Sequence, residues 1–157
     1  METIKKILVA TDFSDTADSA LQRATQLASE LGAELVVLYV LDSSPFVTGS
    51  EAALGSLSLL EVHRAAMEQR LESLARQLAA KHVRALTRLG YGVAHREIVA
   101  TAEQEQVELI VMGTHGRGGF KHMLMGSVAE RVARTASVPV LTVHLDPQGE
   151  VEHATHV

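Results

Sequence analysis

Glycines gather in one short stretch of the chain, where the backbone could bind an anion. The pattern Gly113-x2-Gly116-x9-Gly126-Ser127 follows an apolar run that ends at Met112 and precedes a segment with helical periodicity. A strand, a glycine-rich loop and a helix start, in this order, present backbone N–H groups that a phosphate can reach. Glycine suits such a loop because it lets a ligand approach the backbone closely. We therefore predict that phosphate binds between residues 113 and 127.

The charge of the chain supports a small anionic ligand. The net charge is −5, from 14 basic and 19 acidic residues, and only 3% of residues are aromatic. This composition argues against a general nucleic-acid binder, which would show a basic face and stacking rings. The segment 113–136 carries a local charge of +3, from Arg117, Lys121, Arg131 and Arg134 against Glu130. The same asymmetry could also belong to a solvated helix face.

Two polar residues near these loops have a structural alternative to ligand binding. Ser127 and Glu130 match a Ser-x-x-Glu capping box, which would form without any ligand and is compatible with a phosphate contact. Asp12 follows the first predicted strand, and it could either face a ligand or cap the next helix.

No residue set predicts a catalytic centre or a metal site. The chain has no cysteine, no evident Ser-His-Asp set and no pair of carboxylates with a reason to lie together. His115 and His122 lie in the glycine-rich loop, where a lone histidine usually neither catalyses nor binds metal. His144, His153 and His156 are too loosely spaced to indicate a zinc site. We therefore expect no catalytic residues and no metal ligands.

The elements that must position these residues alternate along the chain. Apolar runs predict strands at 4–10, 35–41, 107–112 and 138–143, and a weaker, more polar pattern predicts one at 83–89. Helical spacing predicts helices at about 17–31, 60–81, 94–104 and 127–136, with a long loop over 42–58. Five strands that alternate with four helices predict an α/β fold, a single doubly wound parallel sheet with helices on both faces.

The strand order 3-2-1-4-5 would place both weaker strands at the edges of this sheet. One of them is the polar strand 83–89, and the other contains Pro139, which favours an edge or first-residue position. Ligands of open α/β sheets bind beyond the carboxyl ends of the strands, where the strand order reverses. In this order the crevice lies between the loops 10–14 and 113–126, which the residue types had already singled out.

Length and hydropathy predict one domain, residues 1–145, followed by a flexible C-terminal tail, residues 146–157. No apolar run reaches the roughly 18 residues of a membrane span, and the N-terminal apolar run is too short for a signal peptide. We therefore expect a cytoplasmic protein that binds neither membranes nor nucleic acid.

The glycine pattern, with its flanking strand and helix, resembles the nucleotide-binding signature of the universal stress protein family, ATP-binding type. It is not a Walker A loop, because no Gly-Lys-Ser/Thr closes it, and the dinucleotide fingerprint would follow the first strand. Residues 7–14 resemble the family's first strand and loop, residues 38–42 the end of its second strand, and residues 126–141 its closing segment. The resemblance covers about residues 4–143 and implies a Rossmann-like, adenine nucleotide alpha hydrolase-like fold.

The resemblance implies that ATP binds here, together with Mg²⁺ or Mn²⁺, in a stress-response protein. Asp12 would meet the ribose or a metal-bound water. The ribose and adenine would lie among Ala10, Thr11, Asp12, Val40, Met112 and Gly113. The triphosphate would lie among Thr114, His115, Gly116, Arg117, Gly118, Gly119, Gly126, Ser127 and Val128, although Arg117 could simply be solvated.

The resemblance further implies a homodimer that forms through the edge of the strand 138–143. In this interpretation the protein regulates by binding ATP and hydrolyses it slowly at most. One alternative is a protein-interaction module whose pocket is vestigial or takes AMP or a cyclic nucleotide. Another is a genuine but slow ATPase or phosphotransferase.

Overall fold

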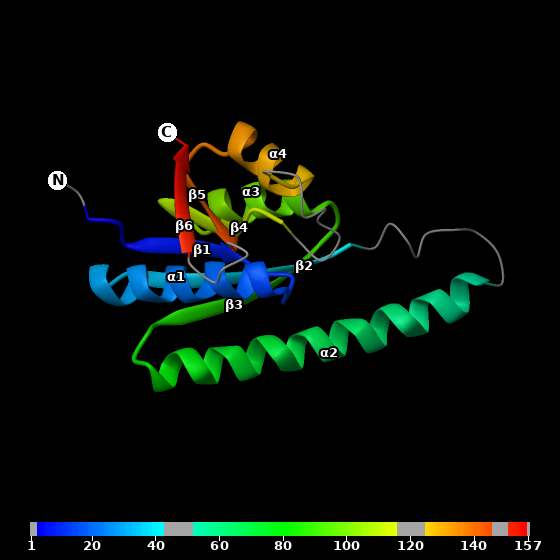
Figure 1. Cartoon of the computed structure of the whole chain (residues 1–157). Coiled ribbons are helices and arrows are strands. Elements are labelled where there is room, and N and C mark those ends of the chain that lie inside the picture. The colour runs from blue at the N-terminus through cyan, green and yellow to red at the C-terminus, as the bar shows by residue number, and fades with distance from the viewer. Residues whose placement is uncertain (1–2, 43–51, 116–124, 146–150, 157) are drawn as a thin grey trace.

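A mostly parallel sheet forms the centre of the computed structural model, which describes residues 3–42, 52–115, 125–145 and 151–156 (Figure 1). The elements are β1 (Lys6–Ala10), α1 (Asp15–Leu31), β2 (Glu34–Leu41), α2 (Ala52–Ala80), β3 (Ala85–Tyr91), α3 (Ala94–Gln104), β4 (Leu109–Gly113), α4 (Ser127–Thr135), β5 (Val140–Leu145) and β6 (Val151–His156). Strands β1 to β5 pair in parallel in the order β3-β2-β1-β4-β5. This confirms the predicted fold and strand order, with the reversal between β1 and β4.

The two faces of the sheet carry separate hydrophobic cores because successive residues of a strand point to opposite sides. Ile7 and Val9 of β1 pack with residues of α1 and α2, whereas Leu8 packs with residues of α3 and α4. Figure 1 shows α1 and α2 on one side of the sheet and α3 and α4 on the other. Coverage on both faces explains why consecutive residues of the central strands are apolar and fully buried.

Helix α1 has a defined residue at each end. The hydroxyl of Ser14 accepts a hydrogen bond from the backbone N–H of Ala17 at 3.3 Å, so Ser14 is the N-cap. The alternative role of Asp12 as the cap is therefore wrong. At the other end Gly32 adopts a left-handed backbone, with φ of 67°, and its N–H donates to the carbonyl of Ala28.

Helix α2 begins earlier than the sequence predicted. The predicted loop 42–58 rests on the turn-forming stretches Ser43-Ser44-Pro45, Gly49-Ser50 and Gly55-Ser56, but the helix starts at Ala52 and includes the last of them. A glycine inside a helix costs only about 1 kcal/mol relative to alanine, and the neighbouring alanines and leucines are strong helix formers. Residues 43–51 of that predicted loop lie outside the described residues. Figure 1 shows that the first turns of α2 extend beyond the sheet.

The C-terminal segment also differs from the prediction. Residues 151–156, predicted as part of a flexible tail, form β6, which pairs antiparallel with β5 from Val140↔His156 to Leu145↔Val151. That part of the prediction is wrong; residues 146–150 and 157 lie outside the described residues. An edge strand presents unpaired N–H and C=O groups, and β6 pairs with those of β5. The described sheet is therefore six-stranded, and β6 lies along the edge at which the family resemblance implies a homodimer.

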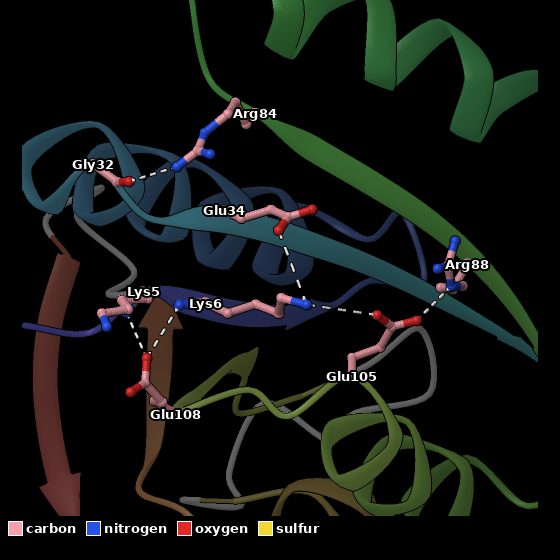
Figure 2. A network of polar contacts seen from close by, with 8 residues as sticks. All are labelled: Lys5, Lys6, Gly32, Glu34, Arg84, Arg88, Glu105 and Glu108. Carbon is pink, nitrogen blue, oxygen red and sulfur yellow. Dashed lines mark hydrogen bonds and ion pairs between the residues drawn. The ribbon is translucent and has the colours of Figure 1, made fainter.

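Charged side chains of several elements meet around Lys6, at the amino end of β1 (Figure 2). The ammonium of Lys6 lies 3.9 Å from a carboxylate oxygen of Glu34 and 3.9 Å from one of Glu105. Glu105 also accepts a hydrogen bond from Arg88 of β3 at 2.7 Å. Glu108 accepts the backbone N–H of Lys6 at 3.3 Å. These contacts join β1, β2 and β3 to the segment between α3 and β4.

Among the helices in the described ranges, none combines the length and the apolar character that a membrane crossing requires.

Candidate functional site

A cavity of about 520 Å³ lies at the carboxyl ends of β1, β2 and β4, where the strand order reverses. This volume falls within the usual range for small-molecule sites, ~300–1,000 Å³. Every predicted site residue within the described ranges lines it: Ala10, Thr11, Asp12, Val40, Met112, Gly113, Thr114, His115, Gly126, Ser127 and Val128. The other predicted residues, Gly116, Arg117, Gly118 and Gly119, lie outside the described residues.

Part of the cavity wall was not predicted from the sequence. These further lining residues are apolar: Ala17, Leu38, Ala94, Ile98 and Ala129. Periodicity predicts that Ile98 faces inward, but it does not separate a cavity wall from an ordinary core. No signal in the sequence marks these five residues.

The loop after β1 is held by short hydrogen bonds. The backbone N–H of Thr11 donates to the carbonyl of Leu38 at 2.9 Å, which keeps the loop against β2. The N–H of Phe13 donates to Oγ1 of Thr11, and the N–H of Ser14 donates to Oδ1 of Asp12, both at 3.0 Å. The Asp12 carboxylate is therefore oriented by its own loop at the wall of the cavity.

Two of the predicted glycines lie where elements approach closely. A Cβ at Gly113 would lie 2.8 Å from Cγ2 and 3.1 Å from the backbone carbon of Thr16, at the start of α1. A Cβ at Gly126 would lie 3.0 Å from the carbonyl oxygen of Thr114. Both glycines therefore have a packing role that needs no ligand.

Two backbone N–H groups of the predicted phosphate loop donate to carbonyl groups of the protein itself. The N–H of Thr114 donates to the carbonyl of Val143 at 2.9 Å, and the N–H of Gly126 donates to the carbonyl of Thr114 at 2.6 Å. The first N–H groups of a helix have no partner within it. Those of α4 begin at Ser127 and Val128, which line the cavity. The start of α4 is therefore the part of this wall that offers donors to an anion.

The predicted capping box at this helix does not form. The N-cap is Gly126, which supplies no side-chain hydrogen bond, and Ser127 is the first helical residue. Glu130 instead lies 3.5 Å from Arg134, one turn further along α4. Among the described residues, the exposed hydroxyl of Ser127 has no hydrogen-bond partner at this helix end.

A threonine hydroxyl connects two histidines at the edge of the cavity. Oγ1 of Thr114 lies 3.0 Å from Nδ1 of His144 and 3.1 Å from Nδ1 of His115. The hydroxyl has one hydrogen, so it can donate to only one of these nitrogens, and the other must carry a proton. Nε2 of His115 is buried and has no partner among the described residues. His144 had no predicted site role, since its contact depends on the pairing of β4 with β5.

Metal binding by protein side chains alone finds no support in the described ranges, which contain no group of three His, Asp or Glu side chains able to hold an ion.

The comparisons with known proteins agree with this fold. Residues 3–144 match the model of the universal stress protein family. Universal stress protein MJ0531 of Methanocaldococcus jannaschii is 40% identical over 140 residues, which cover 88% of this chain and 81% of that protein.

Solved structures show the same architecture. Protein MJ0577, also from Methanocaldococcus jannaschii, matches with a TM-score of 0.84 and 30% identity over 93% of this chain and 99% of that one. A universal stress protein in complex with cAMP matches with a TM-score of 0.68 over 91% of this chain and 98% of that one. Its identity of 24% supports the shared fold alone. By the extent of the family match and the identity of its relatives, this chain belongs to the universal stress protein family.

Proposed function

We propose that this chain is an ATP-binding regulatory protein of the stress response, which holds the nucleotide in the cavity at the carboxyl ends of β1, β2 and β4. The observation that carries the proposal is that three kinds of groups line the same cavity. They are apolar side chains, a carboxylate oriented by its own loop and the start of a helix without a side-chain cap.

The adenine would occupy the apolar part of the cavity. Leu38 and Val40 of β2 and Ile98 of α3 line this part. Burying the faces of a ring against such side chains is favourable by roughly 25 cal/mol per Å² of apolar surface. The polar edge of the base would then be read by backbone groups of the surrounding loops.

The phosphates would lie at the start of α4. The partial positive charge of a helix N-terminus and its unpaired N–H groups favour an anion there. The hydroxyl of Ser127 adds a donor at the same place. Gly126 places no side chain beside them, and a Cβ there would lie 3.0 Å from the carbonyl oxygen of Thr114.

Asp12 would accept a hydrogen bond from a ribose hydroxyl, or from water on a Mg²⁺ or Mn²⁺ ion that arrives with the nucleotide. Mg²⁺ is commonly held by substrate phosphates together with one or two carboxylates and water. This mode suits a cavity in which Asp12 is the one carboxylate among the described lining residues.

We propose binding without appreciable turnover. Among the described residues that line the cavity, Asp12 and His115 are the side chains that could accept a proton. Their own loop holds one atom of each, Oδ1 of Asp12 through the N–H of Ser14 and Nδ1 of His115 through Thr114, and we assign both side chains to ligand binding rather than to proton transfer. ATP would then act by stabilising one conformation of the loops, because a ligand that binds only the folded form shifts the equilibrium by mass action.

We further propose that the protein is cytoplasmic and forms a homodimer through the edge of β5. Since β6 occupies this edge within one chain, a second copy would have to displace β6 or pair beside it.

The proposal is tested by calorimetric titration of the purified chain with ATP, ADP, AMP, cAMP and GTP, each with and without Mg²⁺. We expect heat with ATP and a weaker or absent signal with GTP. Mass spectrometry of small molecules released from the protein as purified would identify a nucleotide that is already bound. Tighter binding of AMP or cAMP than of ATP would reassign the ligand. No heat with any adenine nucleotide, from protein shown to be free of bound nucleotide, would overturn the proposal.

A further inference from the structure

Phe13 has a left-handed backbone, with φ of 59°, in the loop that carries Asp12. Bulky residues seldom adopt this conformation. The chain turns at Phe13, and the side chains of Asp12 and Phe13 line two different cavities. Asp12 lines the nucleotide cavity, whereas Phe13 lines a groove of about 730 Å³ between α1 and α2.

The ring of Phe13 is held by residues that take no part in the nucleotide cavity. It is stacked with the ring of Tyr39 on β2, with centroids 5.5 Å apart and planes 27° apart. The guanidinium carbon of Arg70 on α2 lies 3.9 Å from the centre of the Phe13 ring. The buried Tyr39 is fixed in turn, because its hydroxyl lies 3.1 Å from Nε2 of His63, also on α2.

We propose that Phe13 is a positioning residue, whose ring contacts with Tyr39 and Arg70 hold the left-handed turn that presents Asp12 to the nucleotide. This inference rests on the proposed nucleotide binding. A residue in a sparsely populated backbone conformation persists there only when its surroundings enforce it. The Asp12–Ser14 hydrogen bond closes the turn from one side, and the ring contacts anchor it from the other.

Without the ring contacts, the loop would sample other turns, and only part of the molecules would present Asp12 correctly. The apparent dissociation constant rises in inverse proportion to that competent fraction. A Phe13 that merely fills the groove between the helices would instead affect stability and leave the affinity unchanged.

The experiment measures the dissociation constant for ATP with the full chain at 25 °C, and the melting temperature of the same proteins without nucleotide. Phe13→Leu keeps an apolar side chain but removes the ring, and we expect about tenfold weaker binding. Arg70→Met removes the cation from an exposed position, and we expect binding weaker by roughly two- to fivefold. Arg70→Lys should restore part of this loss.

Two controls separate positioning from simple stability. Arg76→Met changes an exposed arginine of the same helix that lies outside both the cavity and the groove, and it should leave the affinity unchanged. In an Asp12→Ala background, Phe13→Leu should have little further effect, because both changes remove the same contact, whereas independent effects would add.

Unchanged affinity in both Phe13→Leu and Arg70→Met would overturn the inference while leaving nucleotide binding intact. Additive losses with Asp12→Ala would overturn it too. Failure of the unmodified protein to bind any adenine nucleotide would remove the proposed function and this inference together. If Phe13→Leu folds poorly, the ATP affinity of the surface variant Arg70→Met still tests the inference, and an unchanged affinity there would overturn it.

Discussion

The end of α1 and the start of α4, which lie at opposite ends of the sheet, differ in how their backbone groups are satisfied. At the amino ends of the strands, Arg84 donates to the carbonyl of Gly32 at 3.0 Å and so satisfies the end of α1 (Figure 2). At the same end, Lys6 of β1 lies 3.9 Å from carboxylate oxygens of Glu34 on β2 and of Glu105 after α3. At the carboxyl ends, α4 begins behind Gly126 with no side-chain cap, beside a cavity of about 520 Å³.

This difference predicts which end of the sheet determines ligand affinity. The polar groups named at the amino ends of the strands are paired within the protein, although they are partly exposed. The carboxyl ends leave helix donors and a hydroxyl at the surface of a cavity, where a phosphate could pair with them. Changes at the carboxyl ends should therefore alter affinity, and changes at the amino ends should alter stability alone.

Removing the hydroxyl at the start of α4 should produce the largest effect on binding. Losing a hydrogen bond to a charged group costs about 1.5–3 kcal/mol, or roughly ten- to a hundredfold in affinity. We expect this loss in the ATP affinity of Ser127→Ala, measured by calorimetry, with the melting temperature nearly unchanged.

Ser29→Ala is the matched control, because it removes an exposed hydroxyl from α1 away from the cavity and should leave affinity as it was. A normal affinity in Ser127→Ala would remove this residue from the proposed site.

A methyl group at Gly113 should test the packing at the carboxyl ends. The new Cβ would lie 2.8–3.1 Å from atoms of Thr16, including its backbone carbon. Overpacking of this kind typically costs about 1–3 kcal/mol. We therefore expect Gly113→Ala to lower the free energy of unfolding by that amount in urea denaturation.

Gly55→Ala offers the contrasting case, because a Cβ there meets nothing within 4 Å. Inside helix α2 it should raise stability by about 0.5–1 kcal/mol. If Gly113→Ala were as stable as the unmodified chain, the close approach of α1 to β4 would not require glycine.

The fold was predictable because each local pattern agrees with the sheet. Consecutive apolar residues in β1, β2 and β4 follow from coverage on both faces, and the polar β3 fits its edge position. The start of α2 was missed because Gly55 and Ser56 suggest a loop, although single weak residues do not break a long helix. Strand β6 was missed because its pairing depends on the edge of β5, which no local pattern reveals.

The parts of the candidate site that contain loop glycines or a loop carboxylate could be predicted from the sequence, and its apolar wall could not. Glycines and Asp12 stand out in loops at the reversal of strand order. Leu38 looks the same in sequence whether it lines a cavity or fills a core. The left-handed backbone of Phe13 and the contact of Thr114 with His144 correspond to no local pattern, so they could not be predicted from the sequence.

The smallest effect should come from the charged contacts at the amino ends. Glu105→Gln weakens the contacts of this partly buried carboxylate with Lys6 and Arg88. We expect a loss of about 1 kcal/mol in the free energy of unfolding. The difference in the free energy of unfolding between Glu105→Gln and the unmodified chain should become smaller at high salt, since salt screens partly exposed charges.

Glu61→Gln, which disturbs an exposed pair with Arg64 on α2, should change stability little. ATP affinity should be the same in the unmodified chain and in both variants, because neither glutamate lines the cavity. If Glu105→Gln weakened ATP binding at temperatures far below its melting point, the two ends of the sheet would be coupled. The prediction that changes at the amino ends alter stability alone would then be wrong, because a change of charge at that end would alter ATP affinity at the opposite end of the strands.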